Sequence, residues 1–337
     1  MSPEPVIKLA HGGGGVQMQR LIEQELLPAC DVEHGRGGED AAVLPGNGQI
    51  VVSTDTFVIR PAVFPGGDLG KIAVCGTVND VAMRGAKPHY LTLGLIVEEG
   101  TPLSLLRTVM TSVRETCAEA GVALVAGDFK VVERGSGDGI FANTTGVGFP
   151  LLDPAPSIHR AAPGDVVLLN GPLGQHGLAV LAARGDLELM MTVESDCAPL
   201  SGLVAEIVAA GGAGVHVLHD PTRGGMSAAL NEIAGAAGVS IEIEETSLPR
   251  DLGVEGGCEV LGLDPLQVAN EGKVVAIVAP EVAETVLAAM RGHRYGGDSA
   301  VVGTVGAGPA GRVTMRTIVG TRRIIDPPSG ELLPRIC

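Results

Sequence analysis

Aromatic side chains are almost absent from this chain, and their scarcity is what most restricts the core that it can build. The 337 residues include no Trp, 2 Tyr and 5 Phe, but 50 Gly. A hydrophobic content of 45% is still enough for a globular core and excludes disorder of the whole chain. We therefore expect closely packed cores of Ala, Val, Leu and Ile, divided between roughly two domains because single cores stop growing at a few hundred residues.

The charge balance is strongly acidic, with 23 Lys and Arg against 39 Asp and Glu and a formal net charge of -16. A field of this sign repels phosphate backbones and anionic lipid, so neither nucleic acid nor a membrane is an expected partner. No apolar run approaches the roughly 20 residues that cross a bilayer. Because the segment from Met1 to Ala10 also lacks a basic stretch followed by an apolar one, we expect a cytoplasmic protein.

Apolar runs and amphipathic stretches alternate along the chain and predict an α/β (α+β) protein of two domains. A glycine-rich loop and a helix are expected over residues 1–37, followed by a βαβ-like domain over 38–150. Prolines between Pro150 and Pro163 indicate the connection to a second α/β domain over 151–308. Residues 309–337 are expected to form a tail that is extended and mobile unless docked, because the prolines near its end preclude a helix there.

Apolar spacing predicts the elements of each part. In the first domain, helices are expected at 17–27, 68–84 and 103–120, and strands at 41–44, 50–52, 90–97 and 122–126. In the second, strands are expected at 165–169, 214–218, 240–243, 273–278 and 300–305, and helices at 177–183, 200–210, 226–237 and 281–290. The tail contains two further strand-like stretches, at 312–318 and 322–325.

Aspartates that follow apolar runs or lie in helix-entry loops are the main chemical signal: Asp40, Asp55, Asp80 and Asp128. Carboxylates at strand ends converge readily, and oxygen ligands without Cys or His suit Mg²⁺ bound through the phosphates of a nucleotide. Taken singly, each aspartate is better explained as a turn or helix-cap residue. It is the set of four that favours a nucleotide site.

The glycine-rich N-terminal loop is a second candidate for phosphate binding. His11 and the glycines that follow it, including Gly12 and Gly13, could wrap phosphates with unobstructed backbone N–H groups, although no Walker A Lys follows them. A flexible linker explains the same run equally well. Lys130 could neutralise phosphate charge beside Asp128, or it could be an ordinary surface lysine.

Two loops of the second domain also carry candidates. The stretch from His219 to Met226 follows a strand and opens a helix, where α/β proteins bind anions, so Arg223 could clamp a phosphate. An ordinary helix cap is the alternative. Glu271 precedes another strand and is a candidate general base, although exposed turn carboxylates are commoner.

The last residue, Cys337, is the most unusual of the six cysteines. A thiol at the end of a Pro-rich segment suits a carrier that is loaded at one site and processed at another, and an accidental terminal cysteine is the alternative. The other cysteines lie far apart, with no C-x-x-C pair. Neither a disulfide framework nor a cysteine zinc site is therefore indicated.

Several motifs together resemble the HypE family of hydrogenase maturation factors, which are carbamoyl dehydratases. The resemblance is carried by Ser53-Thr-Asp-Thr-Phe-Val, Phe64-Pro-Gly-Gly-Asp-Leu-Gly-Lys-Ile-Ala-Val, Gly76-Thr-Val-Asn-Asp-Val-Ala, Gly127-Asp-Phe-Lys-Val-Val, His219-Asp-Pro-Thr-Arg-Gly-Gly, Ala269-Asn-Glu-Gly-Lys and Leu333-Pro-Arg-Ile-Cys337. It covers nearly the whole chain. The terminal Pro-Arg-Ile-Cys is what distinguishes this family from aminoimidazole ribonucleotide (AIR) synthetase, selenide water dikinase and thiamine monophosphate kinase.

The resemblance implies a two-domain PurM/AIR synthetase-like fold and a homodimer that pairs the sheets of its N-terminal domains, with ATP near that interface. It implies that a carbamoyltransferase, HypF, loads Cys337, that ATP drives dehydration of the thiocarboxamide to a thiocyanate, and that the cyano group passes to iron on a HypC-HypD complex. The implied catalytic residues are Cys337, Glu271 and Lys130, and the implied Mg²⁺ ligands are Asp40, Asp55, Asp80 and Asp128. The implied ATP-binding residues are His11, Gly12, Gly13, Asp40, Asp55, Lys71, Asn79, Asp80, Asp128 and Arg223.

Two other functions are open on the sequence. One is a small-molecule kinase or synthetase of the same superfamily, although selenide water dikinase would be expected to carry Cys or selenocysteine in the loop where this chain has His11 and glycines. The other is a non-enzymatic maturation scaffold, for which loss of Cys337 would leave partner binding intact.

Overall fold

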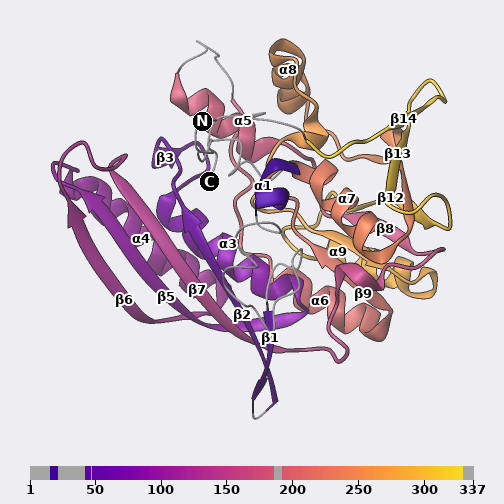
Figure 1. The fold of residues 1–337 in the computed structure, drawn as a ribbon, viewed down its shortest axis with the longest axis horizontal. Helices are drawn as coiled ribbons and strands as arrows, with labels where there is room; N and C mark the ends of the chain where they lie inside the picture. The colour runs from indigo at the N-terminus through magenta and orange to yellow at the C-terminus, as the bar shows by residue number, and fades with distance from the viewer. Residues whose placement is uncertain (1–15, 22–41, 47, 186–191, 329–337) are drawn as a thin grey trace, which may run out of the picture.

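The computed structural model describes residues 16–21, 42–46, 48–185 and 192–328. The predicted helix at 17–27 appears as α1 (Val16–Leu21), and residues 22–27 lie outside the described part. The described chain forms two large sheets with helices packed on them, and one short two-stranded sheet (Figure 1).

The first sheet has five strands in the order β1-β2-β7-β5-β6. Their bounds are β1 Ala42–Gly46, β2 Gly48–Phe57, β5 Ala86–Glu98, β6 Ala123–Val132 and β7 Ile140–Pro150. β5 and β6 run parallel and are joined by α4 (Leu103–Ala120), whereas the other neighbours are antiparallel. The predicted βαβ character is therefore confined to this crossover, and β1 with β2 forms a hairpin instead.

Apolar spacing located the two helices of this domain well. The predicted helix at 103–120 is confirmed as α4, and that at 68–84 as α3 (Leu69–Met83), with Asp68 as its N-cap. Asp68 Oδ1 accepts the N–H groups of Gly70 at 2.7 Å and Lys71 at 3.1 Å, which have no partner inside the helix. A short pair, β3 (Val63–Phe64) and β4 (Gly67–Asp68), leads into α3.

The second sheet has seven strands in the order β14-β13-β10-β12-β8-β11-β9. Its strands are β8 Val166–Leu169, β9 Val215–His219, β10 Ser240–Glu244, β11 Val275–Val278, β12 Ala300–Gly306, β13 Arg312–Arg316 and β14 Arg322–Ile324. Its α-helices are α5 Gln175–Arg184, α6 Ser201–Gly211, α7 Gly225–Ala237, α8 Leu252–Leu261 and α9 Ala283–Gly292. Short 3-10 turns are η3 Ile158–Arg160, η4 Gly212–Gly214, η5 Glu245–Ser247, η6 Pro265–Gln267 and η7 Pro280–Val282.

The beginning of the predicted tail differs from the structure. β13 pairs with β10, and β14 pairs with β13, so residues 312–324 belong to the second sheet rather than to a separate tail. The buried side chain of Ile325 joins the core of this domain. The second domain thus extends at least to this point, instead of ending at residue 308 as predicted.

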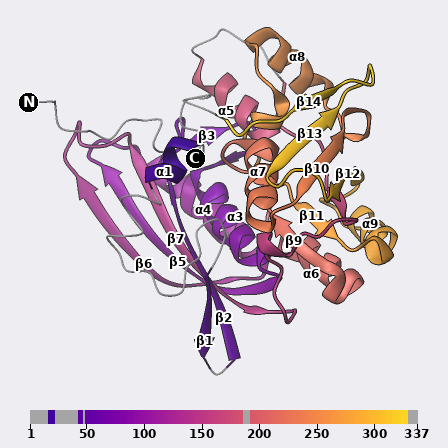
Figure 2. The same ribbon diagram turned by 45° about the vertical axis from the view of Figure 1, so that its right-hand side comes forward.

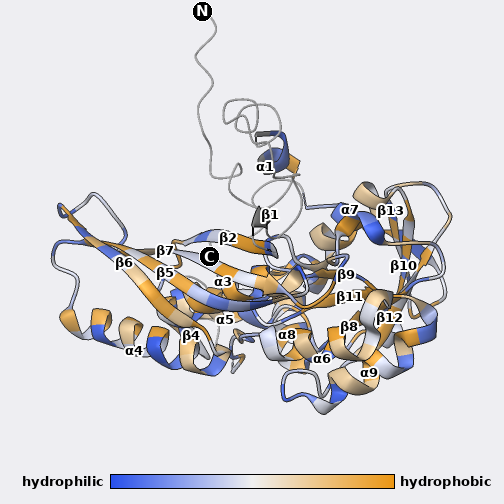
Figure 3. Ribbon diagram, turned by 90° about the horizontal axis from the view of Figure 1, so that it is seen from below, coloured by the Kyte–Doolittle hydropathy of each residue, from blue (hydrophilic) through white to orange (hydrophobic). Residues whose placement is uncertain are grey.

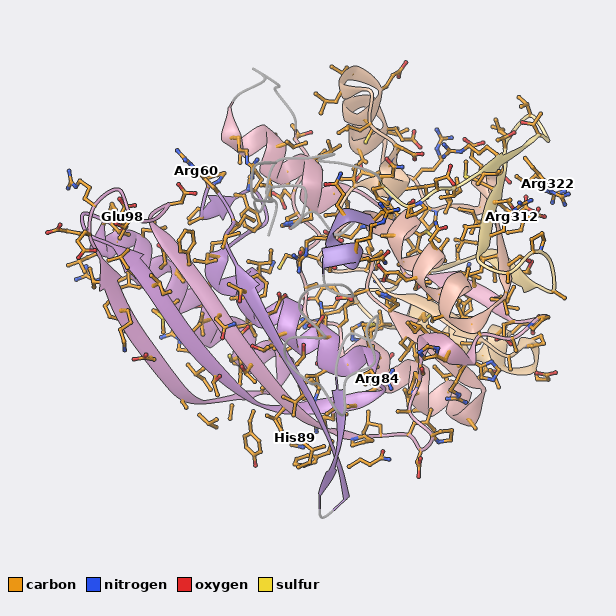
Figure 4. The ribbon with its side chains drawn as sticks, in the orientation of Figure 1. Arg60, Arg84, His89, Glu98, Arg312 and Arg322 are labelled. Carbon is orange, nitrogen blue, oxygen red and sulfur yellow. The ribbon has the colours of Figure 1, made fainter. Side chains whose placement is uncertain are left out.

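Helix α3 joins the two halves of the molecule. Nearly all of its side chains are buried, because it packs against the first sheet and also against α6 (Figure 2). Ala82 and Met83 at its C-terminal end share a core with Leu203 and Ile207 of α6, and Arg84 caps this end (Figure 4). A helix that is apolar all round must be enclosed on all sides, as α3 is here.

The outer strand β6 is exposed along most of its length. In Figure 3, α4 lies beneath the sheet, and the orange of hydrophobic residues covers parts of β5 and β6. Val125, Phe129 and Val131 of β6 are 56%, 48% and 60% exposed. Edge strands with unpaired backbone groups and apolar side chains favour pairing with another chain.

Candidate functional site

The carboxylates of Asp55 and Asp80 lie side by side where β2 crosses α3. Ser53 Oγ, on the same face of β2 as Asp55, donates a hydrogen bond to Asp80 Oδ2 at 2.6 Å. A Cβ added at Gly76 would lie 3.3 Å from Asp55 Oδ2 and 2.9 Å from the Phe57 ring, so the strand approaches α3 closely at this glycine. Gly76 and Asp80 are one helical turn apart, about 6 Å along the axis of α3, so both carboxylates lie along the same face of this helix.

Burial raises the pKa of Asp55, and the charge of Arg223 and a hydrogen bond from the Thr56 N–H oppose this in part. Arg223 lies in the loop that precedes α7, and its backbone and side chain are exposed. The structure therefore brings one predicted anion-binding residue of the second domain toward a predicted carboxylate of the first. A polar site between the domains is the result.

Glu271 lies in the loop before β11 and is only 4% exposed. Its burial raises its pKa well above the usual range, and the negative charges of Asp55 and Asp220 add to this shift. A carboxylate with a raised pKa is a stronger base than an exposed one, which suits a proton acceptor. Glu271 is thus not the exposed turn carboxylate that was the alternative.

Asn79 has a different position from the one predicted. Its side chain is 1% exposed, and Nδ2 donates to the carbonyl oxygens of Ala198 at 3.1 Å and Glu271 at 3.3 Å. Its Oδ1 accepts the N–H of Leu200 at 2.7 Å. These bonds use the amide to hold the Glu271 loop and the start of α6 on α3, so Asn79 positions the site instead of presenting its side chain to a nucleotide.

Lys71 is also engaged within the protein. Its Nζ donates to the carbonyl oxygen of Gly66 at 2.9 Å, and its charge acts on the buried Cys197 thiol. Cys75, Cys117, Cys197 and Cys258 are all buried free thiols. Lys71 is therefore near the domain junction, but the described contacts give it a role in the loop before α3.

Asp128 and Lys130 do not join the Asp55 site within one chain. Instead of following a short strand, Asp128 lies in the middle of β6, because the strand continues to Val132. Register places Asp55 opposite Thr144, Thr144 opposite Leu93 and Leu93 opposite Gly127. Three strand spacings separate β2 from β6, about 14 Å. The expectation that these carboxylates converge at strand ends is therefore wrong for a single chain.

On β6 the two residues form an exposed ion pair, with Lys130 Nζ 2.6 Å from Asp128 Oδ1. The hydrogen bond from Lys130 lowers the pKa of Asp128, and the Phe129 N–H and the lysine charge act in the same direction. Both side chains are mostly exposed, so the pair contributes little to stability by itself.

A buried ion pair that the sequence did not reveal supports the Glu271 loop. Lys273 Nζ lies 2.9 Å from Asp196 Oδ2 and donates at 3.3 Å to Gln175 Oε1. Asp196 also accepts the N–H groups of Glu271 and Gly272, each at 3.2 Å. No local sequence motif predicts this cluster, because its members lie far apart in the sequence.

Asp220, in the loop between β9 and α7, is a further residue of the site. It is 5% exposed, and its buried Oδ2 has no hydrogen-bond partner among the described residues. Burial raises its pKa to about 6, against the opposing charge of His219 and with Asp55 and Glu232 raising it further. The signal that could have found it is its place directly after a buried strand, the same rule that selected Asp55.

The remaining predicted residues cannot be placed. His11, Gly12, Gly13, Asp40 and Cys337 lie outside the described residues. Within the described part, no group of three or more His, Cys, Asp or Glu side chains is arranged to hold a metal ion by itself, and no helix there is long and apolar enough to cross a membrane. The paired carboxylates of Asp55 and Asp80 nevertheless fit Mg²⁺, which takes one or two protein carboxylates and otherwise binds phosphates and water.

Two mixed sheets that share α3, with carboxylates between them, define the chain as an AIR synthase-related protein. The family model for the N-terminal domain of AIR synthase-related proteins matches residues 38–149, and that for the C-terminal domain matches residues 162–316. This confirms the predicted two-domain fold.

Within that class, the chain belongs to the HypE family of carbamoyl dehydratases. It is 48% identical over 335 residues to the carbamoyl dehydratase HypE of Rhodobacter capsulatus, with 98% of each chain covered. It is similar to HypE in a crystal structure of a HypE-HypF complex, with a TM-score of 0.87, 48% identity and coverage of 91% of this chain and 99% of that one. For a HypE structure in complex with ATP, the TM-score is 0.83 at 44% identity, covering 98% and 100%.

Proposed function

We propose that this protein uses ATP to dehydrate a carbamoyl group carried as a thiocarboxamide on Cys337, and so supplies the cyanide ligand of the NiFe-hydrogenase iron centre. The observation that carries the proposal is the buried Glu271, whose pKa is raised by burial and by the nearby charge of Asp55 at the domain junction. It supports a proton acceptor close to a candidate phosphate-binding carboxylate. Family membership and the terminal Pro-Arg-Ile-Cys support the same activity.

The chemical problem is that an amide oxygen leaves poorly as hydroxide. In the proposed reaction, the thiocarboxamide oxygen attacks the γ-phosphorus of ATP and ADP leaves, while one N–H proton is lost. The C–O bond then breaks with release of phosphate, the second N–H proton is lost, and S–C≡N remains. The water removed from the amide ends in phosphate, so the sum is thiocarboxamide plus ATP to thiocyanate, ADP, phosphate and a proton.

Glu271 is assigned the transfer of a proton from the thiocarboxamide nitrogen. Its burial keeps water away and raises its pKa, which makes its carboxylate a stronger base than an exposed glutamate. Asn79 and Asp196 hold the backbone of Glu271 in place through hydrogen bonds. Mg²⁺ held by Asp55 and Asp80 would neutralise the phosphates of ATP, and Arg223 would contact them from the second domain.

Asp128 and Lys130 enter this proposal through a homodimer. They lie too far from Asp55 to share a ligand with it in one chain, whereas pairing of the exposed β6 edge with a second copy would bring them toward the partner's site. The exposed apolar side chains of β6 support such pairing. Lys130 would then neutralise the transferring phosphoryl group. To do so, it would exchange its ion pair with Asp128 for contact with the more highly charged phosphate.

The proposed partners follow from the reaction. A carbamoyltransferase of the HypF kind must load Cys337, as the solved HypE-HypF complex suggests. A HypC-HypD complex is proposed to receive the cyano group on its iron. The site of action is proposed to be the cytoplasm.

The test is mass spectrometry of the intact protein and its C-terminal peptide after carbamoylation by HypF. We expect Cys337 to gain one carbamoyl group and to lose the mass of one water only when Mg-ATP is added. A Glu271→Gln variant should be loaded normally but should dehydrate at least about a hundredfold more slowly. If the C-terminal peptide never changes mass, the protein acts on a small molecule or as a scaffold, and the proposal fails.

A further inference from the structure

Asp220 has no part in the reaction proposed above, although it lies at the same junction as Glu271. It follows β9 directly, in the loop that leads to α7. β9 and β11 are antiparallel neighbours in the second sheet, with His219 opposite Val275 (Figure 2). The loop after β9 and the loop before β11 therefore lie at the same end of the sheet, and Asp220 and Glu271 come from adjacent loops.

Direct hydrogen bonds hold these two loops together. Asn270, which directly precedes Glu271, donates to the carbonyl oxygen of Pro221 from its backbone N–H at 3.2 Å and from Nδ2 at 2.9 Å. Pro221 directly follows Asp220. The charge of Asp220 acts on Glu271, and the charge of Asp55 acts on Asp220. Asp220 thus stands close to both the candidate base and a candidate phosphate-binding carboxylate.

The carboxylate of Asp220 is buried without a full set of partners. It is 5% exposed, and its Oδ2 has no hydrogen-bond partner among the described residues. His219 Nδ1 is 3.9 Å from Asp220 Oδ1, and the ring already bonds the Asp220 carbonyl oxygen at 3.0 Å and Glu232 Oε2 at 3.2 Å. Because an unpartnered buried carboxylate oxygen costs free energy, its presence indicates a hydrogen-bond donor that a ligand supplies.

The thiocarboxamide of the proposed reaction is such a donor. Its nitrogen carries two N–H groups, and Glu271 is assigned only one of them. The phosphates of ATP offer acceptor oxygens and negative charge, so they cannot pair with a carboxylate. Mg²⁺ is assigned to Asp55 and Asp80, and within the described ranges no third His, Cys, Asp or Glu completes a group arranged for a metal ion. The second N–H is the donor that remains.

We propose that Asp220 Oδ2 accepts a hydrogen bond from the second N–H of the thiocarboxamide and so holds the nitrogen with its other N–H toward Glu271. This role of Asp220 deepens the proposed function and rests on it. A carried acyl group without N–H groups would leave Oδ2 unpaired and would be disfavoured. Asp220 is therefore also a specificity-determining residue for the carbamoyl group.

Asp220→Asn tests this contact, because it keeps the size of the side chain, removes its charge and replaces one acceptor oxygen by a donor. The full-length protein is loaded by HypF, and the loss of water from the Cys337 peptide is timed at saturating Mg-ATP. We expect dehydration to be at least about tenfold slower than in the natural protein, as for the loss of a hydrogen bond to a charged group. Dehydration at the natural rate would overturn the proposal.

Asp165→Asn is the matched control. Asp165 is 3% exposed, but its Oδ2 is already bonded to His216 Nδ1 and to the N–H of Ala162, each at 2.8 Å. It precedes β8, which runs parallel to β9, so it lies at the end of the sheet opposite Asp220. We expect Asp165→Asn to lose stability in urea denaturation and to dehydrate at the natural rate.

Stability should respond in the opposite way at Asp220. Because Asp220→Asn removes a buried charge that lacks a partner, it should keep or raise the free energy of unfolding while dehydration slows. A loss of stability as large as that of Asp165→Asn would give Asp220 a structural role and would overturn the proposal.

Calorimetry separates the proposed contact from metal binding. Asp220→Asn should leave the affinity for Mg-ATP unchanged, because the contact is made to the carried group and not to the nucleotide. A weakening as large as that expected for Asp80→Asn would make Asp220 a ligand of the nucleotide's metal ion and would overturn the proposal. Absence of water loss in the natural protein would refute the dehydratase function and this contact together, whereas full-rate loss in Asp220→Asn would refute the contact alone.

Discussion

Replacing Lys273 by Met should destabilise this protein far more than a surface substitution, because it leaves the carboxylate of Asp196 buried without its cation. The side chains of the pair are 8% and 3% exposed, and their N–O distance is 2.9 Å. Removing one partner of such a buried pair costs about 3–5 kcal/mol. We expect Lys273→Met to lower the free energy of unfolding by that amount at neutral pH, measured by urea denaturation followed by far-UV circular dichroism.

The double variant Asp196→Asn/Lys273→Met is the matched control. Because it removes both charges and keeps the side chains at similar size, it should lose less than half as much stability as Lys273→Met alone. Equal losses in the two variants would refute the reasoning, since they would show that lost packing rather than an uncompensated charge sets the cost.

The pH dependence gives an independent check. Burial alone would raise the pKa of Asp196, but Lys273, His176 and the hydrogen bonds from Lys273 and Glu271 lower it overall. The pair therefore stabilises the fold above the ordinary aspartate pKa of about 3.9 and is lost as the pH falls through the lowered folded value. Without Lys273, burial raises the pKa of Asp196, and protonation removes the cost of burying its charge. The difference in free energy of unfolding between the variant and the natural protein should therefore shrink as the pH falls. A constant difference would contradict this account.

Three further predictions concern the site. Because burial raises the pKa of Glu271, the dehydration rate should increase as the pH rises through that raised pKa, above the ordinary glutamate range, and Glu271→Gln should abolish this rise; a flat profile in the natural protein, measured by the C-terminal peptide assay, would exclude Glu271 as the base. Asn79→Ala should cost about 2–4 kcal/mol in urea denaturation, because it leaves buried backbone groups without partners, and loss of ATP affinity without loss of stability would restore Asn79 to the nucleotide site. Asp80→Asn should weaken Mg-ATP binding at least about tenfold in calorimetry, and an unaltered affinity would remove that residue from the site.

Local sequence was sufficient to predict a helix wherever the helix's own residues determine that it forms. The helix at 103–120 was predicted to the residue, and the spacing of apolar residues from Leu69 to Ala82 predicted a buried helix. α8 was missed because Leu252–Leu261 contains three glycines and so has weak helix propensity. Its Asp251 cap, which accepts the N–H groups of Gly253 and Val254, was the available signal.

The sequence by itself also determined the residue types from which the chemistry can be built. Carboxylates after apolar runs, Glu271 before a strand and a cysteine at the end of the chain are all visible without coordinates. They predict a nucleotide site and a carrier thiol because the chemistry of each group is a property of the side chain itself. None of these signals says which groups are neighbours.

Only the tertiary structure decided that question, since it depends on strand order, register and burial. Strand order separates Asp128 from Asp55, and close packing of α3 turns Asn79 into a support for the Glu271 loop. Enclosure by both domains, which no local pattern encodes, is also what raises the pKa values of Glu271 and Asp220. A side chain's identity is local, but its neighbours and its contact with water are set by segments far away in the chain.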